Sequence, residues 1–395
     1  MDNNQLTTTT QNSKLALAKK DIDSLAQSFQ YKPFVIENKC LSIVKSITIT
    51  PDGNTIVLVN SNHIIKLWDV RSGECLKTLK KHSDGVESIA ITPDGKTIAS
   101  GSYVKTIKLW DMQSGECLKT LKRHSGRVIS IAITPNGETI VSGDDDGAIK
   151  LWDVRSGECL KTLKKHSDGV ESIAITPDGK TIVSVGGWDD GIKLWDMQSG
   201  VCFKTLEDQV TDVTSIAITP DGKTIVSVGG WDDGIKLWDV RSGECLKTIN
   251  ENSYGIESIV IAPDGKTIIS GGPDGIKLWD MQSGVCFKTL EDQVTDITSI
   301  AITPDGKTII SGGGRDGIKL WDVRSGECSY TINNECEVSI DKHGYFKASD
   351  EVIKDFIRVS EAPLTQRKLT TEEIKYFRKK GNFLEIGEII PKPKV

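Results

Sequence analysis

Apolar and polar residues alternate over short stretches along most of the chain, and the whole pattern returns every 41 to 43 residues. Stretches such as VESIAIT (86–92) alternate and are rich in β-branched residues, which is typical of half-buried strands. The turn PDGK follows, in which proline fixes φ and glycine accepts a positive φ. The stretches TIVS, IKLWD and CLKTL, or close variants, complete each unit. Each unit therefore predicts four short antiparallel strands.

The IKLWD stretch occurs seven times and ends at residues 69, 111, 153, 196, 239, 280 and 322. A single four-stranded sheet cannot bury both of its faces, but sheets packed around a common axis can cover one another. The repeat therefore predicts an all-β fold, a β-propeller of four-stranded antiparallel blades.

The chain resembles the WD40-repeat family, because the Trp-Asp signature appears in seven units that cover roughly residues 43 to 333. The resemblance implies a rigid propeller that binds other proteins. It also implies a structural role for the third-strand tryptophans, which are Trp68, Trp110, Trp152, Trp195, Trp238, Trp279 and Trp321.

In that family the tryptophan joins a hydrogen-bonded set of a second-strand Ser or Thr, a His before the first strand, and an Asp before the third. The third unit matches with His124, Ser142, Asp146 and Trp152, and the fourth with His166, Ser184, Asp189 and Trp195. A Ser-His-Asp set could be catalytic, but a hydrolase needs one site with an exposed nucleophile. A set that recurs around a ring instead satisfies its own buried hydrogen bonds. We therefore predict no catalytic residue.

The ring could close in two ways. PFVIE (33–37) lies 42 residues before CLKTL of the first unit, in the register of a fourth strand, and residues 335–368 contain three weaker strand-like stretches. We expect these segments to form a degenerate eighth blade, with residues 33–37 as its closing strand. The alternative is a seven-bladed ring with residues 335–368 as an appendage.

The ends of the chain differ from the repeats, which span residues 33–334. Residues 1–32 comprise a polar tail and a stretch, 13–29, whose apolar spacing predicts an amphipathic helix. Residues 369–395 comprise a second predicted helix, with a capping box at Thr370 and Glu373, and an apolar tail. These short terminal helices either cover an edge of the propeller or bind partners.

Composition narrows the class of protein. The chain has 395 residues and a net charge of -6, so a nucleic acid or an acidic membrane surface is not an expected partner. No window approaches the ~18 apolar residues of a membrane helix, and no signal peptide is evident. We expect a cytoplasmic protein without cofactor or metal. Seven cysteines recur in one local context, SGECLKT or a variant, and we expect them to be small buried apolar residues.

The stretch GGWDDGIKLWD (186–196) contains a second tryptophan and returns at 229–239. This tryptophan lies in the loop before the third strand, at the end of a propeller where WD40 proteins usually bind peptides. A tryptophan beside carboxylates suits a segment that carries Arg or Lys. The alternatives are that each ring folds over its own blade, or that the second copy is a passenger of duplication. The candidate partner-binding residues are Trp188, Trp231, Asp190, Asp232, Asp233, Tyr103, Lys105 and Arg315.

The turn after each Trp-Asp alternates between VRSG and MQSG, so the chain grew by duplication of pairs of blades. We predict a protein–protein interaction scaffold, monomeric or part of a larger complex, whose protein or peptide partner the sequence does not name. The alternative is a regulatory or sensor module attached to an effector through its terminal helices. An enzyme is the least expected class, because neither a phosphate loop nor a metal cluster occurs in the sequence.

Overall fold

The computed structural model describes residues 34–36, 43–79, 85–164, 166–187, 191–206, 213–229, 234–249, 255–290, 296–314, 317–333, 338–341, 345–347, 357–362, 365–368 and 384–385. The chain divides into two compact units. One unit is Leu41–Asn334, and the other combines Met1–Cys40 with Glu335–Val395.

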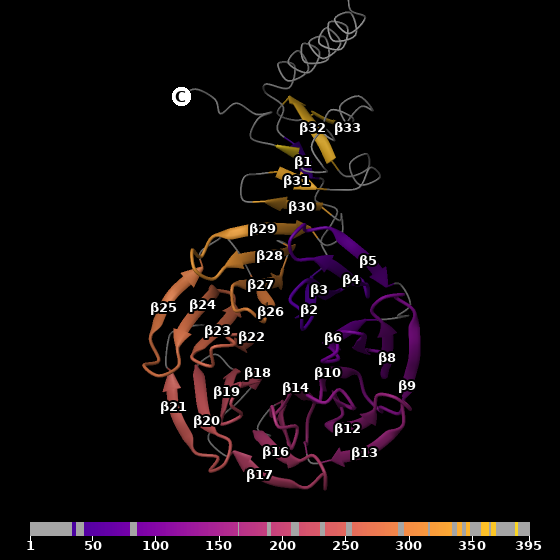
Figure 1. The fold of residues 1–395 in the computed structure, drawn as a ribbon, viewed down its shortest axis with the longest axis vertical. Helices are drawn as coiled ribbons and strands as arrows, with labels where there is room; N and C mark the ends of the chain where they lie inside the picture. Colours follow the sequence, from indigo (N-terminus) through magenta and orange to yellow (C-terminus); the bar gives the residue numbers. More distant parts are fainter. Residues whose placement is uncertain are drawn as a thin grey trace, which may run out of the picture. The chain divides into compact units, whose positions relative to one another are not determined.

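Seven four-stranded antiparallel blades of the first unit surround a central opening, and the strands of each blade follow the order of the chain from the axis outward (Figure 1). Blades 1 to 4 consist of β2 (Val44–Ile49), β3 (Thr55–Asn60), β4 (Ile65–Asp69), β5 (Cys75–Leu79); β6 (Val86–Ile91), β7 (Thr97–Ser102), β8 (Thr106–Asp111), β9 (Cys117–Lys122); β10 (Val128–Ile133), β11 (Thr139–Asp144), β12 (Ala148–Asp153), β13 (Cys159–Lys164); β14 (Val170–Ile175), β15 (Thr181–Gly186), β16 (Ile192–Asp196), β17 (Cys202–Leu206).

Blades 5 to 7 follow the same order. They consist of β18 (Val213–Ile218), β19 (Thr224–Gly229), β20 (Ile235–Asp239), β21 (Cys245–Ile249); β22 (Ser258–Ile261), β23 (Thr267–Gly272), β24 (Gly275–Asp280), β25 (Cys286–Leu290); β26 (Ile297–Ile302), β27 (Thr308–Gly313), β28 (Gly317–Asp322), β29 (Cys328–Asn333). The four strands expected for each repeat are confirmed in all seven repeats.

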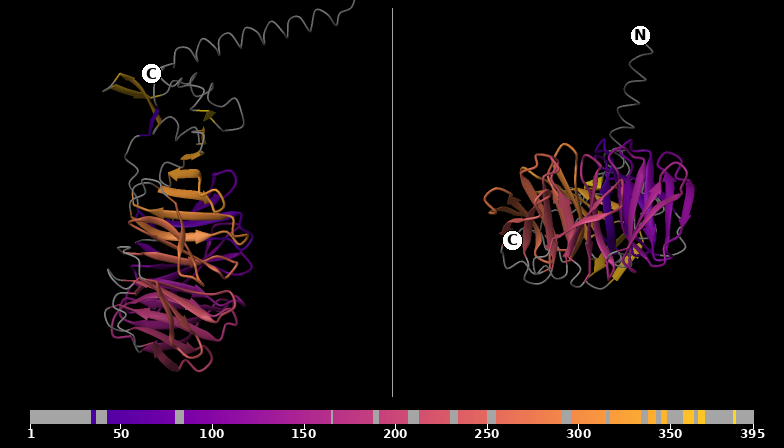
Figure 2. Two further views of the ribbon diagram at one scale, coloured as in Figure 1. Left: turned by 90° about the vertical axis from the view of Figure 1, so that its left-hand side faces the viewer. Right: turned by 90° about the horizontal axis from the view of Figure 1, so that it is seen from below.

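The hydrophobic core of the propeller lies between the blades. The third-strand tryptophan of each blade packs into the preceding blade: Trp152 of β12 contacts a layer that includes Ile107 and Leu121 of blade 2. Six further layers of the same kind join the remaining neighbours. All seven tryptophans are at most 2% exposed, so their expected structural role is supported by burial. Edge views show the blades stacked side by side around the ring (Figure 2).

A buried serine on the second strand of six blades accepts a hydrogen bond from the indole Nε1 of the same blade. The Nε1–Oγ distances run from 2.7 to 2.9 Å for the pairs Trp110–Ser100, Trp152–Ser142, Trp195–Ser184, Trp238–Ser227, Trp279–Ser270 and Trp321–Ser311. Blade 1 has Leu58 at the serine position, and Trp68 Nε1 is buried without a hydrogen-bond partner among the described residues. Trp68 is therefore held by apolar packing and by the Lys66 ammonium group over its ring, without the indole–serine bond.

The ring closes between blade 7 and blade 1. Val44 and Ile47 of β2 pack with Ile310 of β27 in one apolar layer. Ile47 N donates to Ser299 Oγ at 3.0 Å, and the same blade-to-blade bond links Ile131 N to Ser88 Oγ at 3.1 Å within the ring. The expected eighth blade is therefore wrong and the seven-bladed alternative is correct, because the first strand of blade 1 already occupies the place beside blade 7.

A lysine on the fourth strand of blades 1 to 6 reaches a turn carbonyl of the next blade. Lys204 Nζ donates to the Arg241 carbonyl at 2.9 Å, and Lys288 Nζ to the Arg324 carbonyl at 2.6 Å. The corresponding pairs elsewhere are Lys77 to Gln113, Lys119 to Arg155, Lys161 to Gln198 and Lys247 to Gln282. Blade 7 has Tyr330 at this position and packs it against the closing apolar layer instead.

The described strands of the second unit form two groups. In the first, β1 (Phe34–Ile36) pairs antiparallel with β32 (Ile357–Ala362), which pairs with β33 (Thr365–Lys368). In the second, β31 (Tyr345–Lys347) lies between β30 (Val338–Asp341) and β34 (Leu384–Glu385). The PFVIE segment thus contains a strand that pairs near residues 357–359, as the sequence suggested, but in a separate sheet and not in a blade.

The expected terminal helices, 13–29 and the one that begins near Thr370, lie outside the described residues. Within the described part of the chain, no helix has the length and apolarity needed to cross a membrane.

The missing indole acceptor in blade 1 generates a stability prediction. Trp152→Phe replaces the indole with a smaller ring and removes its hydrogen bond to Ser142. Trp68→Phe makes the same change of ring size but removes no hydrogen bond, since Trp68 Nε1 has no acceptor among the described residues. We expect Trp152→Phe to lower the free energy of unfolding by about 1–2 kcal/mol more than Trp68→Phe. Chemical denaturation followed by circular dichroism measures both; equal losses would contradict the role given to the indole–serine bond.

Candidate functional site

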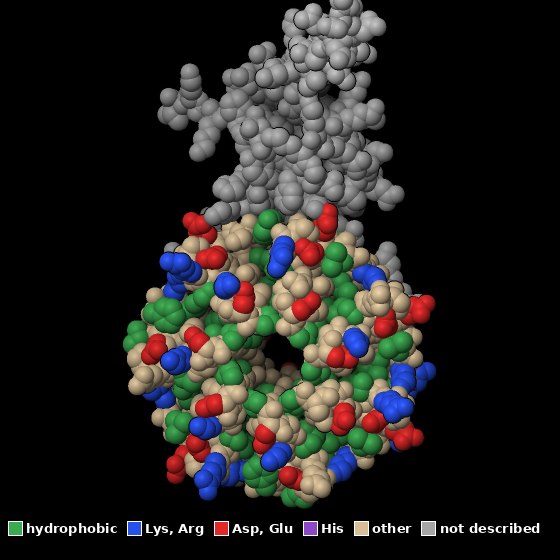
Figure 3. All heavy atoms as spheres, in the orientation of Figure 1, with side chains coloured by type: hydrophobic (Ala, Val, Ile, Leu, Met, Phe, Trp, Pro, Cys, Tyr) green, Lys and Arg blue, Asp and Glu red, His purple; other side chains and the backbone are tan. Residues whose placement is uncertain are grey.

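The antiparallel order of the strands gives the propeller two different ends. The loops before the first and third strands of each blade lie on one end, here called the loop face. The PDGK and SGE turns lie on the other end, here called the turn face. Figure 3, which shows one end of the ring, displays acidic and basic side chains interspersed around the central opening.

Most of the predicted partner-binding residues fall outside the part of the chain that the structure describes. These are Trp188, Trp231, Asp190, Asp232, Asp233 and Arg315, together with Asp189 of the predicted fourth-unit set. Tyr103 and Lys105 are described; both lie in the loop between β7 and β8, where Tyr103 is half-buried and Lys105 exposed.

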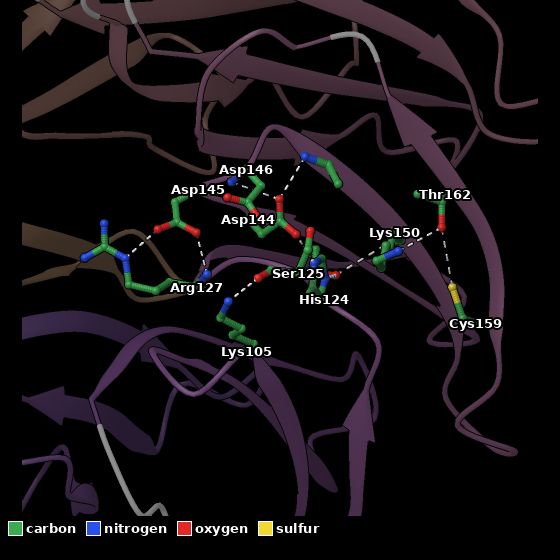
Figure 4. A network of polar contacts seen from close by, with 12 residues as sticks. Lys105, His124, Ser125, Arg127, Asp144, Asp145, Asp146, Lys150, Cys159 and Thr162 are labelled. Atoms are coloured by element: carbon green, nitrogen blue, oxygen red, sulfur yellow. Dashed lines mark hydrogen bonds and ion pairs between the residues drawn. The ribbon is translucent and has the colours of Figure 1, made fainter.

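The hydrogen-bonded set of blade 3 is complete, and Figure 4 shows its His124 and Asp144. His124 Nε2 lies 2.7 Å from Ser142 Oγ, and its Nδ1 lies 2.7 Å from Asp144 Oδ2. Ser142 Oγ also accepts the Trp152 indole hydrogen bond at 2.8 Å. This chain of bonds ties the loop before β10 to the second and third strands of the blade.

The carboxylate of this set is Asp144, and the sequence-based choice of Asp146 is corrected. Asp144 is the last residue of β11, so strand alternation directs its side chain into the blade, where it is fully buried. Its Oδ1 also accepts hydrogen bonds from Asp146 N at 3.2 Å and Ala148 N at 2.8 Å. Asp146 lies two residues later in the exposed part of the loop and contributes its backbone N–H to the set.

Blade 4 has the same histidine, serine and tryptophan but a different third partner. His166 Nε2 lies 2.7 Å from Ser184 Oγ, and Ser184 accepts the Trp195 indole bond at 2.7 Å. Gly186 occupies the position of Asp144, and the buried Lys193 places Nζ 3.4 Å from His166 Nδ1. The equivalent histidines of blades 3 and 4 therefore have neighbours of opposite charge, a carboxylate beside His124 and an ammonium group beside His166.

The geometry argues against catalysis by these sets. Ser142 and Ser184 have no exposed surface, and each hydroxyl already accepts an indole hydrogen bond and contacts a histidine. A nucleophile must reach a substrate carbonyl beside oxyanion donors. These serines serve as internal hydrogen-bonding partners. Among the described residues, no group of three His, Cys, Asp or Glu side chains is arranged to hold a metal ion.

The seven repeated cysteines are free thiols, but they are not fully buried as the sequence suggested. Six are half-buried and Cys245 is exposed, because the fourth strand is the outermost strand of each blade. Their sulfur atoms lie near a backbone carbonyl two residues later, as for Cys117 Sγ and the Lys119 oxygen at 3.4 Å. They therefore act as weak local donors at the rim of the ring.

Side chains from blades 1 to 3 form one polar network on the loop face. Lys45 Nζ lies 3.7 Å from Glu87, and the Glu87 carboxylate accepts a hydrogen bond from the Tyr103 hydroxyl. That bond, together with burial and the Glu87 charge, raises the pKa of Tyr103. The Arg127 guanidinium lies over the Tyr103 ring at 5.2 Å, and its Nε donates to Asp145 at 2.6 Å.

The described residues of the loop face on blades 4, 6 and 7 include several carboxylates. Glu257 of blade 6 and Asp296 of blade 7 approach closely enough to interact. Burial chiefly raises the pKa of Glu257, the Asp296 charge raises it further, and Lys45 opposes both effects. Asp168 and Glu171 add two exposed carboxylates on blade 4. These residues and the network of blades 1 to 3 are here called the channel mouth.

The sequence reading missed Glu87, Arg127 and Asp145. A positional signal was present for Arg127, which is the one basic residue directly before the valine or isoleucine that opens a blade. The other blades carry Ile43, Gly85, Gly169, Asp212, Gly255 and Asp296 at that position. Its partner, Asp145, was not recognisable, because the pairing depends on a loop conformation.

The two aspartates of blade 3 provide a matched comparison. Asp144→Asn removes the charge from a buried set of three hydrogen bonds, and we expect it to lower the free energy of unfolding by roughly 2–3 kcal/mol. Asp146→Asn changes an exposed side chain and should stay within about 0.5 kcal/mol of the wild type. Urea unfolding at neutral pH measures both; the reverse order would restore Asp146 to the set.

The contribution of Asp144 should also depend on pH. Burial alone would raise the pKa of Asp144, but hydrogen bonds from His124 and Ala148 outweigh it, and the pKa lies below its ordinary value of 3.8. Its stabilising effect is therefore present above the pKa of the unfolded chain and is lost as pH falls through the lower folded value. The stability gap between wild type and Asp144→Asn should be steady from neutral pH to about 5 and narrow at lower pH. A gap that widened in acid would contradict this assignment.

A comparison with known protein families matches the WD40 family, described as "WD domain, G-beta repeat", over residues 73–111, 115–153, 157–196, 200–239, 243–280 and 284–322. No curated protein matched the chain as a relative. The matched repeats cover more than half of the chain, and each spans the fourth strand of one blade and the first three strands of the next. WD40 propellers are generally non-catalytic and commonly serve as protein-interaction scaffolds. The chain belongs to the WD40-repeat family and forms a seven-bladed propeller.

Proposed function

We propose that this propeller is a protein-interaction scaffold that holds an extended segment of a partner protein on its loop face. The observation that carries the proposal is the continuous network from Lys45 to Asp145, which joins side chains of three blades at the channel mouth. Because these side chains are held before a partner arrives, less conformational entropy is lost on binding.

The turn face differs in kind, which favours the loop face as the working surface. Its polar side chains are satisfied within their own turns: Asp111 Oδ1 accepts from Ser114 N at 2.6 Å, and Thr92 donates to Asp94 at 2.6 Å. These local bonds hold the pKa of both carboxyls below the ordinary value. Such turns are rigid, and the lysine of the preceding blade reaches backbone carbonyls of the turn after the third strand, whereas the loop-face network joins side chains of three blades.

The chemistry of the loops favours a partner that carries Arg or Lys. Asp168, Glu171, Glu257 and Asp296 supply carboxylates at the channel mouth. The sequence adds Trp188 and Trp231, each followed by two aspartates, in the corresponding loops of adjacent blades. A cation beside carboxylates and over an indole gains from both ion pairing and cation–π attraction.

The first test compares two paired variants by affinity purification from a native lysate with quantitative mass spectrometry. Trp188→Ala/Trp231→Ala changes the loop face, and Arg155→Ala/Arg241→Ala changes the turn face. We expect the principal partner to be lost with the tryptophan pair, since truncation of an interface tryptophan costs about 2 kcal/mol, or roughly thirtyfold in Kd.

Thermal unfolding serves as the control: both paired variants must have the same unfolding temperature as the wild type before their partners are compared. Retention of the partner by the tryptophan pair together with its loss from the arginine pair would place binding on the turn face. That result would contradict the proposal.

A further inference from the structure

The channel mouth is divided by charge. Lys105 of blade 2 and Arg127 of blade 3 are here called the cationic corner, and the loop that pairs with Arg127 carries Asp145 and Asp146. Lys45 of blade 1 instead lies beside Glu87 and interacts with Glu257. On blades 4, 6 and 7 the described loop residues include the carboxylates Asp168, Glu171, Glu257 and Asp296. A ligand lying across the opening therefore meets a cationic corner at one end and acidic groups at the other.

Arg127 is fixed in the cationic corner while half of its side chain stays exposed. Its backbone N–H and its Nε both donate to the Asp145 carboxylate, the latter at 2.6 Å, and 51% of the side chain is accessible to solvent. In Figure 4 the terminal nitrogens of the guanidinium point away from Asp145. The planar end of Arg127 is thus presented in one orientation, which suits recognition of a carboxylate or phosphate.

The Tyr103 ring makes a cation–π contact with the Arg127 guanidinium and is itself fixed by its neighbours. Its backbone N–H donates to the Gly85 carbonyl at 2.7 Å, and its ring lies so close to Gly85 that a Cβ there would be 2.0 Å from Cδ2. The Arg127 guanidinium lies over the ring, 5.2 Å from its centroid. Among the described residues of the propeller loops, Tyr103 is the one Phe, Tyr or Trp side chain.

Gly126, like Gly85, leaves no room for a side chain. A Cβ at this residue would lie 2.1 Å from Asp145 Oδ1, the oxygen that accepts from the Arg127 backbone. Glycines in two successive blade-opening loops are therefore required by the Tyr103–Arg127–Asp145 arrangement. The corner is built from specific residues of blades 2 and 3, and repetition of the blade sequence does not produce it elsewhere among the described residues.

Lys105 completes the corner. It adopts a φ of 62°, in the left-handed region, where the corresponding residue of blade 3 is Gly147 with a φ of 77°. Its ammonium group donates to the Ser125 carbonyl in the loop that also carries Arg127. An exposed cation is thus held beside Arg127 although glycine would fit the backbone better.

We propose that this corner binds the acidic part of a partner segment whose basic part lies over the carboxylates of blades 4 to 7. The partner is an extended protein segment with acidic and basic side chains separated along its length, so it can bind in one direction only. This inference rests on the proposed function, because it assumes that the loop face binds a protein segment, and it adds the charge pattern and orientation of that segment.

The test is selection of a random-peptide library displayed on phage with three full-length proteins. These are the wild type, Lys105→Glu/Arg127→Gln, and the turn-face control Arg155→Glu. We expect the wild type and the control to select peptides with acidic residues toward one end and basic residues toward the other. The double variant should no longer select acidic residues at that end.

A synthetic peptide from the wild-type selection then gives the magnitude. We expect its Kd at low ionic strength to rise about tenfold or more for Lys105→Glu and to recover when its acidic residues are replaced by lysine. Thermal unfolding checks that each variant is folded, and Arg127→Lys separates loss of charge from loss of the planar guanidinium.

The contrary outcomes distinguish the inference from the function on which it rests. Selected peptides that lack acidic residues, or that bind the double variant as tightly as the wild type, would overturn the inference while leaving loop-face binding in place. Failure of the wild type to select any peptide, or loss of selection only in the Arg155→Glu control, would contradict both proposals.

Discussion

The apolar layer between neighbouring blades is the interaction on which the propeller depends. Each layer combines the second to fourth strands of one blade with the first two strands and the third-strand tryptophan of the next, and the tryptophan is almost completely buried there. No blade buries both of its faces by itself, so the stability of every blade depends on two neighbours. The requirement is met only when the last blade finds the first, and the layer formed by Val44, Ile47 and Ile310 provides that contact.

Closure with seven blades has a consequence for a chain that duplicated in pairs. VRSG and MQSG turns alternate along the sequence, but seven is odd, so two VRSG blades meet at the junction of blade 7 with blade 1. This junction also differs in its bonds. Tyr330 replaces the lysine that reaches the next blade elsewhere, and Trp68 lacks the serine that accepts its indole proton. Apolar packing and the hydrogen bond from Ile47 N to Ser299 Oγ join blade 7 to blade 1 instead.

Polar groups refine this apolar framework differently from blade to blade. In blade 3 the His124–Asp144 pair ties the entering loop to the strands, whereas blade 4 places Lys193 beside the equivalent histidine. A buried pair contributes specificity and fixes loop geometry more than it adds stability. The His124–Asp144 pair joins the loop before β10, which carries Arg127, to the end of β11, which Asp145 follows, so the internal hydrogen-bonded set supports the surface contact between Arg127 and Asp145.

The sequence alone determined the repeat, the four strands of each blade and the buried tryptophans, because these follow from periodicities that every copy repeats. It did not determine the number of blades. Strand-like residues such as PFVIE are compatible with several partners, and only the fit between β2 and blade 7 excluded an eighth blade.

The same limit applied at the site. Asp144, Asp145 and Asp146 are adjacent and chemically identical, so pattern matching chose Asp146 as the buried partner of His124. Strand alternation and the turn that follows bury Asp144, direct Asp145 to Arg127 and expose Asp146. Side chains that act across blades, such as Tyr103 and Arg127, are brought together by the closed ring, because residues from different repeats meet only when the blades pack.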